Sequence, residues 1–417
     1  MQKVTIIGGG IVGLSTAYYL QKAGFSVTIL DEGRLEEGCS FGNAGMIVPS
    51  HFIPLAAPGM IAKGIRWMFD AQSPFYVRPR LSRDLISWGL RFYRHANSKH
   101  VERSMPAMSA LSLYSKLHYQ EWARTLPFDF GYLERGLLML YHDVALEKEE
   151  RETAHLAHRL GIEARILSLS EIQAMEPDVR VNARGGVYYP GDAHIIPGSL
   201  VRNLIQFLGK QGVTMEREAR VDSFVSEGDS IKAVRTTRGE FTSDHWVLAT
   251  GSWAGQMAKG LNLSLPMQAG KGYSFTLNDV TKNIRIPTIF LEARVAVTPM
   301  GPDLRFGGTM EITGNDHSIN MNRVKGIVNS INKYYPDMQV GMPGKENVWH
   351  GLRPCSPDGL PYIGRTKRRK NLVIAAGHAM MGLSLGPGTG KLVSDLVEGK
   401  IPAVDLTMFD PDRYDRP

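Results

Sequence analysis

The sequence predicts an α/β protein with two domains. Its 417 residues exceed what one hydrophobic core usually organises, and its 43% apolar and 21% charged content is typical of a globular chain. An apolar, β-branched run at residues 4–7 leads straight into a cluster of glycines, and a helical pattern follows over residues 14–23. A buried strand followed by a turn and a helix is the repeating unit of parallel α/β sheets. These observations together define the fold class.

The glycine cluster has the spacing GxGxxG between the strand and the helix. In such a turn the first glycine permits a tight bend, the second lets the backbone approach a pyrophosphate, and the third lets the helix pack on the strand. The start of the helix presents free backbone N–H groups, which favour an anion, and Gly24 closes the helix. The sequence therefore predicts a pyrophosphate-binding turn. The residues expected to bind there are Gly8, Gly10, Ile11, Val12 and Gly13.

The second predicted strand, residues 26–30, ends at an acidic pair, Asp31 and Glu32. An acid about 20 residues beyond the glycines accepts hydrogen bonds from the ribose hydroxyls of an adenosine. A carboxylate at this place disfavours a 2′-phosphate, because the two negative charges would repel each other. We therefore expect an adenine dinucleotide, and the motif by itself leaves NAD and FAD open.

The charge balance and the cysteines narrow the classes of partner. The formal net charge of +7 suits an anion, which could be a nucleic acid, an anionic membrane surface, a dinucleotide or a carboxylate substrate. Lysines and arginines are scattered except at residues 367–370, so we predict no nucleic-acid partner. The two cysteines, Cys39 and Cys355, lack the spacing of metal ligands, and we predict no metal site.

We predict neither a secretory signal nor a membrane-spanning segment. The chain begins with a structured element and lacks the ordered basic, apolar and cleavage regions of a signal peptide. No window approaches the roughly 20 consecutive apolar residues that a spanning helix requires. We therefore expect a cytoplasmic protein, whose only membrane contact would be peripheral, at the inner face of the cytoplasmic membrane.

Three further segments narrow the function. Residues 38–46 read GCSFGNAGM, residues 246–252 read WVLATGS, and residues 349–364 read WHGLRPCSPDGLPYIG. Together with the N-terminal motif, these segments resemble the FAD-dependent D-amino-acid dehydrogenases, in the wider group that includes glycine oxidase, sarcosine oxidase and D-amino-acid oxidase. The resemblance covers almost the whole chain. It implies FAD as the cofactor, where the N-terminal motif had left NAD open.

The resemblance also implies how the two domains are divided along the chain. A Rossmann-like FAD-binding domain would be assembled from residues 1–50, 190–260 and 345–417. An interleaved α+β substrate-binding domain with a mostly antiparallel sheet would be built from residues 51–189 and 261–344.

The same resemblance assigns the remaining cofactor contacts. Residues 38–46 would run under the pyrophosphate towards the flavin ring, and residues 246–252 would pack against the adenosine. A glycine-rich stretch at residues 382–390 precedes a predicted helix at residues 391–397, and it would place N–H donors near a flavin carbonyl. The additional residues expected at the cofactor are Ser40, Asn43, Ala44, Gly45, Met46, Val221, Gly251, Trp253, Arg353, Gly382, Leu383 and Ser384.

Arg353 is the candidate that would anchor a substrate. Oxidation of an amino acid at Cα requires a fixed carboxylate, and a guanidinium fork matches a carboxylate with two parallel hydrogen bonds. The resemblance gives the arginine of the LRP segment this role. The alternative is that Arg353 pairs with a structural acid such as Asp358.

Four other side chains are candidates for contact with the substrate. Tyr273, in the segment KGYS, could bond the carboxylate or the amine, or it could be an ordinary sheet tyrosine. Glu311 could receive the ammonium group, or it could face solvent. His51 and His378 could move a proton, although such histidines more often only pack or donate a hydrogen bond.

Two departures from the relatives bear on the substrate and on the cofactor link. Met380 and Met381 stand where glycine-oxidase types have an arginine, which favours a hydrophobic substrate side chain unless the methionines simply fill the core. Cys355 lies near the region where some sarcosine oxidases attach flavin covalently, but it is out of register. We therefore expect non-covalent FAD.

Residues 51–120 alternate proline, aromatic and basic residues, with helical patterns at residues 85–93 and 108–122. The resemblance places this segment in the substrate domain and implies that electrons leave through a membrane quinone. A basic, aromatic surface could touch anionic headgroups. The alternative is an ordinary lid or a pair of helices between the domains.

The predicted reaction is the oxidative deamination of a D-amino acid to a 2-oxo acid and ammonia. A hydride would pass from Cα to flavin N5, and a quinone or an artificial acceptor would then take the electrons. The alternatives are a D-hydroxyproline or D-proline dehydrogenase, an oxygen-using oxidase of the glycine or sarcosine type, and a flavoprotein that only carries electrons. Arg353 argues against the last of these.

Overall fold

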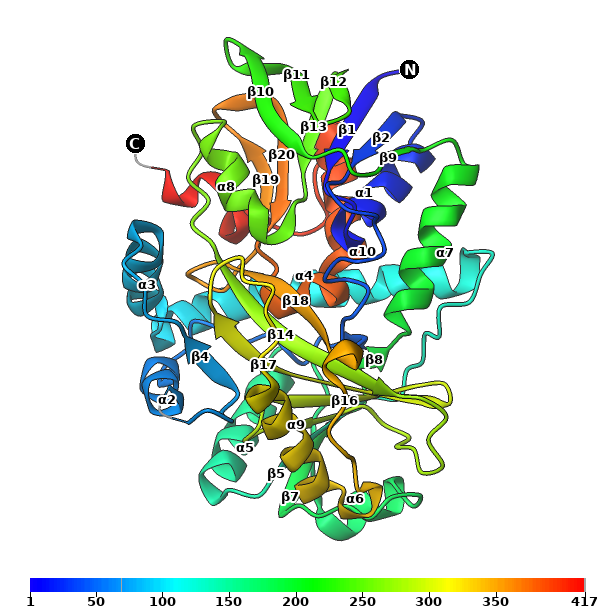
Figure 1. Cartoon of the computed structure of the whole chain (residues 1–417), viewed down its shortest axis with the longest axis vertical. Coiled ribbons are helices and arrows are strands. Elements are labelled where there is room, and N and C mark those ends of the chain that lie inside the picture. Colours follow the sequence, from blue (N-terminus) through cyan, green and yellow to red (C-terminus); the bar gives the residue numbers. More distant parts are fainter. Residues whose placement is uncertain (69, 416–417) are drawn as a thin grey trace.

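The computed structural model describes residues 1–68 and 70–415, and it confirms the predicted α/β fold. Its two large sheets lie at opposite ends of the molecule (Figure 1). The strands of the first sheet are β1 (Lys3–Ile7), β2 (Ser26–Leu30), β9 (Thr214–Glu216), β13 (His245–Leu248), β19 (Tyr362–Thr366) and β20 (Arg369–Ala376). Their order is β19-β20-β13-β1-β2-β9. All neighbouring pairs are parallel except β19 and β20.

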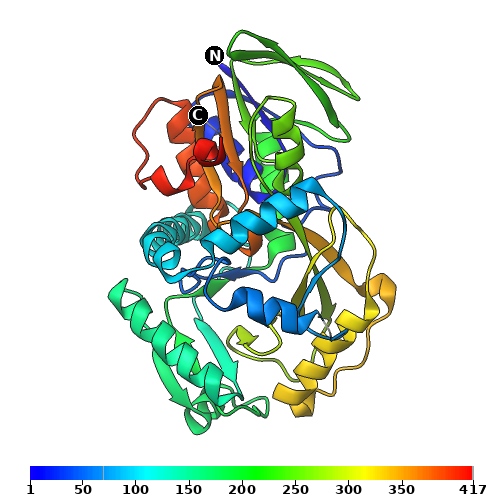
Figure 2. The same cartoon turned by 90° about the vertical axis from the view of Figure 1, so that its left-hand side faces the viewer.

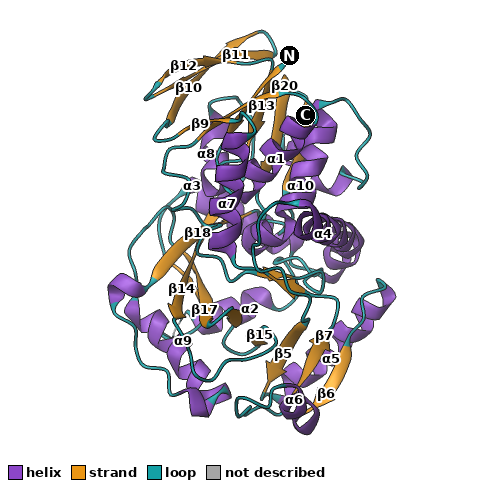
Figure 3. Cartoon of the chain, turned by 90° about the vertical axis from the view of Figure 1, so that its right-hand side faces the viewer, coloured by secondary structure: helices purple, strands orange, loops and turns teal. Residues whose placement is uncertain are grey.

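Both faces of the first sheet are covered, as a parallel sheet requires. On one face lie α1 (Ile11–Lys22), α7 (Pro197–Lys210) and α10 (Gly382–Val397), which share one hydrophobic core with the sheet (Figure 3). On the other face lie α8 (Ala254–Lys259) and the antiparallel strands β10 (Val221–Glu227), β11 (Ser230–Thr236) and β12 (Gly239–Thr242). The predicted strand, helix and strand over residues 4–30 therefore appear where the sequence placed them.

The second sheet is mostly antiparallel, as predicted. Its strands are β4 (Phe75–Val77), β5 (Leu137–Tyr141), β6 (Arg165–Ser168), β7 (Gly185–Tyr189), β14 (Gln268–Leu277), β15 (Thr288–Phe290), β16 (Val295–Met300), β17 (Asp303–Ile312) and β18 (Trp349–Cys355). Their order is β18-β14-β17-β16-β15-β5-β7-β6, with β4 paired to β17. Helix α9 (Met321–Tyr334) packs on β14, β16 and β17, and α5 (Val144–Arg159) packs on β5 and β7.

The predicted domain boundaries are wrong in two places. Strand β18 was assigned to the nucleotide-binding piece, but it pairs with β14 along its whole length, so it is the edge strand of the second sheet. Helix α4 (Ser98–Thr125) was assigned to the substrate domain, but its Tyr119 and Trp122 lie in the core that α1 shares with the first sheet. Strand pairing decides the neighbour of β18, and burial of an apolar face decides that of α4; sequence order decides neither.

Helix α10 begins at Gly382, nine residues before the helix predicted at residues 391–397. Glycine has a low helix propensity, but here the absence of side chains allows close helix packing. A Cβ at Gly388 would lie 2.8 Å from the backbone of α4, and a Cβ at Gly390 would lie 2.5 Å from the backbone of α1. The glycine-rich stretch therefore forms the first half of a buried helix.

Two hydroxyl groups of α4 bond backbone groups of α10 around Pro387. Proline has no N–H to bond the Leu383 carbonyl, and the Tyr119 hydroxyl donates to that oxygen at 2.7 Å. The Ser115 hydroxyl donates to the Ser384 carbonyl at 2.7 Å and accepts the N–H four residues later at 3.1 Å. The first turn of α10 therefore depends on hydrogen bonds from a distant part of the sequence.

Within residues 1–68 and 70–415, no helix has both the length and the apolar character that crossing a membrane requires.

Candidate active site

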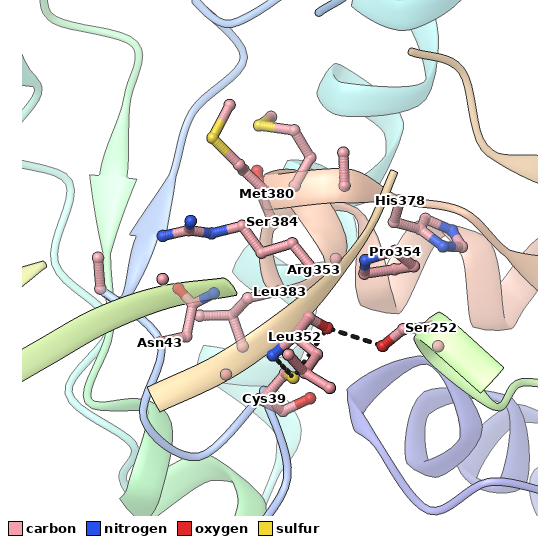
Figure 4. A pocket seen from close by; sticks show the side chains of 18 of the residues that line it. Cys39, Asn43, Ser252, Leu352, Arg353, Pro354, His378, Met380, Leu383 and Ser384 are labelled. Atoms are coloured by element: carbon pink, nitrogen blue, oxygen red, sulfur yellow. Dashed lines mark hydrogen bonds between the residues drawn. The ribbon is translucent and has the colours of Figure 1, made fainter. Parts of the chain in front are cut away.

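A cavity of about 1030 Å³ lies between the two sheets. Its wall is formed by the turn after β1, by residues 31–51, by strands β14, β17 and β18, and by the start of α10. Figure 4 shows part of this wall, with Arg353 near the start of α10 and Asn43 on the loop that crosses below it. This volume lies at the upper end of the range for ligand pockets, so it suits a cofactor together with a small substrate.

The glycine turn after β1 is shaped so that only backbone meets the cavity. Gly8 has φ +106°, and a Cβ there would lie 2.4 Å from the Ala249 carbonyl oxygen. A Cβ at Gly13 would lie 1.9 Å from the Gly8 carbonyl oxygen, so helix and strand touch as predicted. A Cβ at Gly10 would meet only the Ser40 hydroxyl, at 3.5 Å. The space that a side chain would fill at Gly10 is open to a ligand, which fits a pyrophosphate at the start of α1.

Asp31 holds this turn as well as lining the cavity. Its two carboxylate oxygens accept the N–H groups of Gly9, at 2.7 Å, and Gly33, at 2.8 Å. Glu32 also lines the cavity, and burial raises the pKa of its carboxyl group above the usual value. Each carboxylate oxygen of Asp31 has a second lone pair, so the residue can still accept a ribose hydroxyl.

The loop over residues 38–46 is fixed by its own polar side chains. The Ser40 hydroxyl accepts the N–H of Ile11 at 2.9 Å, and the Asn43 side-chain oxygen accepts the N–H of Gly45 at 2.9 Å. Gly45 has φ +80°, and a Cβ there would lie 2.4 Å from the Ile195 carbonyl oxygen. Gly45 and Gly13 therefore stand behind the cavity wall and shape it. The predicted cofactor residues that line the cavity are Gly8, Gly10, Ile11, Val12, Asp31, Glu32, Ser40, Asn43, Ala44, Met46, Val221, Gly251, Trp253, Arg353, Gly382, Leu383 and Ser384.

Arg353 is a cation on the cavity wall that forms no ion pair with any described acid. Its Nη1 donates to the Thr309 carbonyl, and burial lowers its pKa. A Cβ at Gly272 would lie 2.2 Å from the guanidinium, so this glycine lets Arg353 lie flat on β14. The alternative partner, Asp358, is instead paired with Arg413 at 2.7 Å. Arg353 is therefore available to an anionic ligand.

The residue before Arg353 is clamped in place. Leu352 donates its N–H to the Cys39 sulfur at 3.0 Å, and its carbonyl accepts the Cys39 thiol at 3.1 Å and the Ser252 hydroxyl at 3.0 Å (Figure 4). Burial raises the pKa of both cysteine thiols, that of Cys355 to about 12. Both cysteines are therefore protonated, poorly nucleophilic thiols at neutral pH.

The structure does not bring Glu311 to the cavity, which corrects its predicted contact with substrate. Glu311 is 3% exposed, and its carboxylate faces Lys271 at 3.7 Å and Arg323 at 3.5 Å. Tyr273 does line the cavity, but its hydroxyl donates to Glu311 and accepts the Asn320 N–H at 3.2 Å. The hydroxyl of Tyr273 is therefore already bonded within a buried network.

A backbone irregularity explains why sequence reasoning misplaced Glu311. Side chains alternate between the two faces of a regular strand, but the pairing of β14 with β17 shifts register between Lys271 and Tyr273. Thr309 of β17 has φ +66°, in the left-handed region. The shift changes which side chains of β17 face the cavity, and no residue pattern marks it.

The two candidate histidines occupy different settings. His378 lines the cavity, its Nε2 lies 3.1 Å from the Thr389 hydroxyl, and burial lowers its pKa to about 3. His51 also lines the cavity, burial lowers its pKa to about 4, and its Nδ1 lies 3.1 Å from the Ser50 hydroxyl. Both imidazoles are therefore neutral at neutral pH.

Both apolar and charged side chains, among them Lys63, Glu149 and Arg294, line the rest of the cavity. Met380 and Met381 line it, with Met139 and Tyr189. Glu150 of α5 also lines the cavity, burial raises its pKa to about 7, and its Oε2 has no described hydrogen-bond partner. Glu150 was not predicted, because in the sequence it stands within an ordinary charged helical stretch.

Residues 3–396 of the chain match the DAO family, which is described as FAD dependent oxidoreductase. The D-amino acid dehydrogenase of Granulibacter bethesdensis is 31% identical over 411 residues, which cover 97% of each chain. That of Neisseria meningitidis is 32% identical over 406 residues, covering 95% of this chain and 96% of the relative.

Solved structures are similar over the whole chain. Glycine oxidase from Geobacillus kaustophilus has a TM-score of 0.80 and 24% identity, and covers 100% of both chains. L-proline dehydrogenase from P. horikoshii has a TM-score of 0.77 and 19% identity, covering 100% of this chain and 98% of its own. At these identities the likeness shows a shared fold.

Proposed function

Because the chain belongs to the DAO family of FAD dependent oxidoreductases, we propose that it oxidises D-amino acids to 2-oxo acids and ammonia. Its relatives at 31% and 32% identity over nearly their whole length are D-amino acid dehydrogenases, which supports this substrate class. The observation that carries the proposal is Arg353, a half-buried guanidinium on the cavity wall without an acidic partner among the described residues.

When bound, FAD supplies the hydride acceptor for Cα, and the resulting imino acid is hydrolysed by water. The backbone N–H groups at the start of α1 would hold the pyrophosphate, and Asp31 would accept the ribose hydroxyls. The start of α10 lines the cavity, and the positive end of its helix dipole favours negative charge there. FAD would be held without a covalent link, since burial raises the pKa of both the Cys39 and the Cys355 thiol and makes them poor nucleophiles.

Arg353 binds the substrate carboxylate with its two parallel N–H groups. Gly272 gives the guanidinium room to lie flat, and the hydrogen bonds of Leu352 to Cys39 and Ser252 fix the strand that carries it. Holding the carboxylate in one orientation fixes the position of Cα and its hydrogen. The apolar wall around Met380 and Met381 suits a hydrophobic side chain.

The test is the visible flavin absorbance of the purified protein without oxygen, with D- and L-amino acids added one at a time. We expect D-amino acids to bleach the flavin band and L-amino acids to leave it unchanged. Acid precipitation should release the flavin from the protein. Flavin that no amino acid reduces would overturn the proposed function.

Two substitutions at one position test the carboxylate site. Arg353→Met removes both the charge and the fork, and should weaken substrate binding by about 2–5 kcal/mol, while flavin remains bound. Arg353→Lys keeps the charge and loses the fork, so its loss should be smaller. If the flavin of Arg353→Met is reduced at the same D-amino acid concentration as in the wild-type protein, Arg353 does not have this role.

The electron acceptor is proposed to be a quinone. The comparison is peroxide formation in air against reduction of a soluble quinone analogue by the same sample. Rapid peroxide formation would identify an oxygen-using oxidase instead. Comparing flavin reduction by D-proline with that by D-phenylalanine distinguishes a D-proline or D-hydroxyproline dehydrogenase from an enzyme with a broader substrate range.

A peripheral contact with an anionic membrane is a second proposal, supported by an exposed apolar surface on α2 (Met60–Trp67) and α3 (Arg83–His95). Both helices lie on the face turned to the viewer in Figure 2. The exposed basic residues Arg83 and Arg94 accompany this surface. Apolar side chains next to basic ones suit an interface with anionic headgroups. The exposed apolar residues are Ile65 on α2, Leu81 just before α3, and Ile86, Leu90 and Tyr93 on α3.

Co-flotation with phosphatidylglycerol vesicles tests this contact. Leu90 on α3 is 58% exposed, and Leu117 on α4 is 60% exposed, so they form a matched pair. Leu90→Glu should lower the bound fraction several-fold, while Leu117→Glu should leave it unchanged. Equal binding of both variants would favour the alternative of an ordinary interdomain helix pair. Phe69, between the two helices, lies outside the described residues.

A further inference from the structure

A chain of three polar side chains leads from a buried carboxylate to the cavity. Asp192 is 1% exposed, and its Oδ1 accepts the N–H of Ser50 at 3.1 Å. Its Oδ2 accepts the hydroxyl of Ser50, and the same hydroxyl oxygen lies 3.1 Å from Nδ1 of His51. His51 lines the cavity, so these three side chains connect the interior with the cavity.

The direction of these hydrogen bonds follows from the ionised carboxylate. A carboxylate can only accept, so the Ser50 hydroxyl must donate its proton to Asp192. The Ser50 oxygen then has only lone pairs left for His51, and the hydrogen between them must reside on Nδ1. A neutral imidazole carries one N–H, so Nε2 of His51 bears the free lone pair. Nε2 has no hydrogen-bond partner among the described residues.

We propose that Asp192 and Ser50 are positioning residues that fix the tautomer of His51, so that Nε2 accepts a hydrogen bond from the amino group of the substrate. This rests on the proposed function. A hydride leaves Cα from the form of the substrate that has a neutral amine, and an acceptor aligned with an N–H of that amine orients its lone pair towards Cα. Burial keeps His51 neutral, with a pKa near 4, so the imidazole does not repel an ammonium group.

Protonation of Asp192 reverses the direction of the hydrogen bonds that link Asp192, Ser50 and His51. Burial raises the pKa of Asp192 to about 7, and below that pH the carboxyl group donates to Ser50. The Ser50 hydroxyl then donates to Nδ1 of His51, and Nε2 carries the hydrogen and no longer accepts. Reduction by substrate should therefore fall as pH drops through about 7. The other charged or titratable groups near the chain are Lys116, Arg294, Glu150, Tyr188 and Tyr189.

The tautomer can be measured directly by ¹⁵N NMR of histidine-labelled holoenzyme without substrate. The His51 signals are assigned from their loss in His51→Gln. We expect the wild-type protein to show a protonated Nδ1 above pH 7 and a protonated Nε2 well below it. An unchanged tautomer across this range would overturn the proposal.

Asp192→Asn should reverse the direction of these hydrogen bonds at every pH. An asparagine amide in place of Oδ2 donates to Ser50, so His51 should show the protonated Nε2 even at high pH. In steady-state kinetics the variant should lose the inflection near pH 7. Ser50→Ala removes the relay, and His51 should then show a mixture of tautomers that does not respond to Asp192.

Glu176 supplies the matched control. It is fully buried, burial raises its pKa to about 7, and it accepts the backbone N–H groups of Arg285 and Ile286. Glu176→Gln should leave both the His51 tautomer and the pH profile unchanged. If it shifts them as Asp192→Asn does, the positioning role is excluded. If the tautomer responds as expected but no D-amino acid reduces the flavin, the proposed function fails and the tautomer control stands.

Discussion

Two helices begin at the wall of the same cavity, and they are built in opposite ways. The start of α1 is shaped by its neighbours in sequence, because β1, the glycine turn and Gly13 lie within residues 3–13. The start of α10 depends on Tyr119 and Ser115, which belong to α4 and are more than 260 residues away. Both helix starts line the cavity. The comparison teaches that a helix end at a cavity can be encoded locally or completed by distant hydroxyl groups.

The largest expected effect comes from breaking the local design. Gly13→Ala would place a Cβ 1.9 Å from the Gly8 carbonyl oxygen, so the helix must move away from the strand. We expect a loss of about 3 kcal/mol or more in unfolding free energy, together with loss of bound flavin. Gly209, in α7, has no atom within 4 Å of a built Cβ, and Gly209→Ala should change stability by less than about 1 kcal/mol. Denaturant titration and flavin content measure both variants.

Removing a hydrogen bond between α4 and α10 should have a smaller effect. Tyr119→Phe leaves the Leu383 carbonyl buried without a donor, which should lower the unfolding free energy by about 1–3 kcal/mol. Tyr19 is buried in the same core, but its hydroxyl has no hydrogen-bond partner among the described residues. Tyr19→Phe should therefore be neutral or slightly stabilising. Similar losses for both tyrosines would show that packing, and not the hydroxyl, supports α10.

The smallest effect is expected for a hydrogen bond that links the start of α1 to a residue outside residues 3–13. The start of α1 is largely local, but the N–H of Ile11 donates to Ser40, which lies 29 residues further along the chain. Ser40→Ala should cost about 1 kcal/mol of unfolding free energy, as the loss of a helix cap does. Ser223 is exposed on β10, and Ser223→Ala should change stability by no more than about 0.5 kcal/mol. Thermal unfolding of both proteins without added flavin is the measurement.

The candidate site was predictable where a single segment determines it. The glycine turn, Asp31 and the loop over residues 38–46 line or shape the cavity as expected. Arg353 was found through its motif, and the structure shows it unpaired because Arg413 neutralises Asp358. Glu311 was misplaced, because the register shift in β14 and β17 is a property of the paired strands. Asp192 and Ser50 were not found, since neither residue belongs to a recognisable motif.

The sequence by itself determined the glycine turn, the strand that ends at Asp31 and the arginine that lines the cavity. These features depend on residues a few positions apart, whose backbone preferences and spacing are visible in the chain. Only the tertiary structure decided that α4 completes α10, that β18 joins the second sheet, and that Asp192 reaches His51 through Ser50. The physical reason is that buried polar groups must find partners and buried apolar faces must find neighbours. Those partners come from whichever segment the fold brings close, at any distance along the sequence.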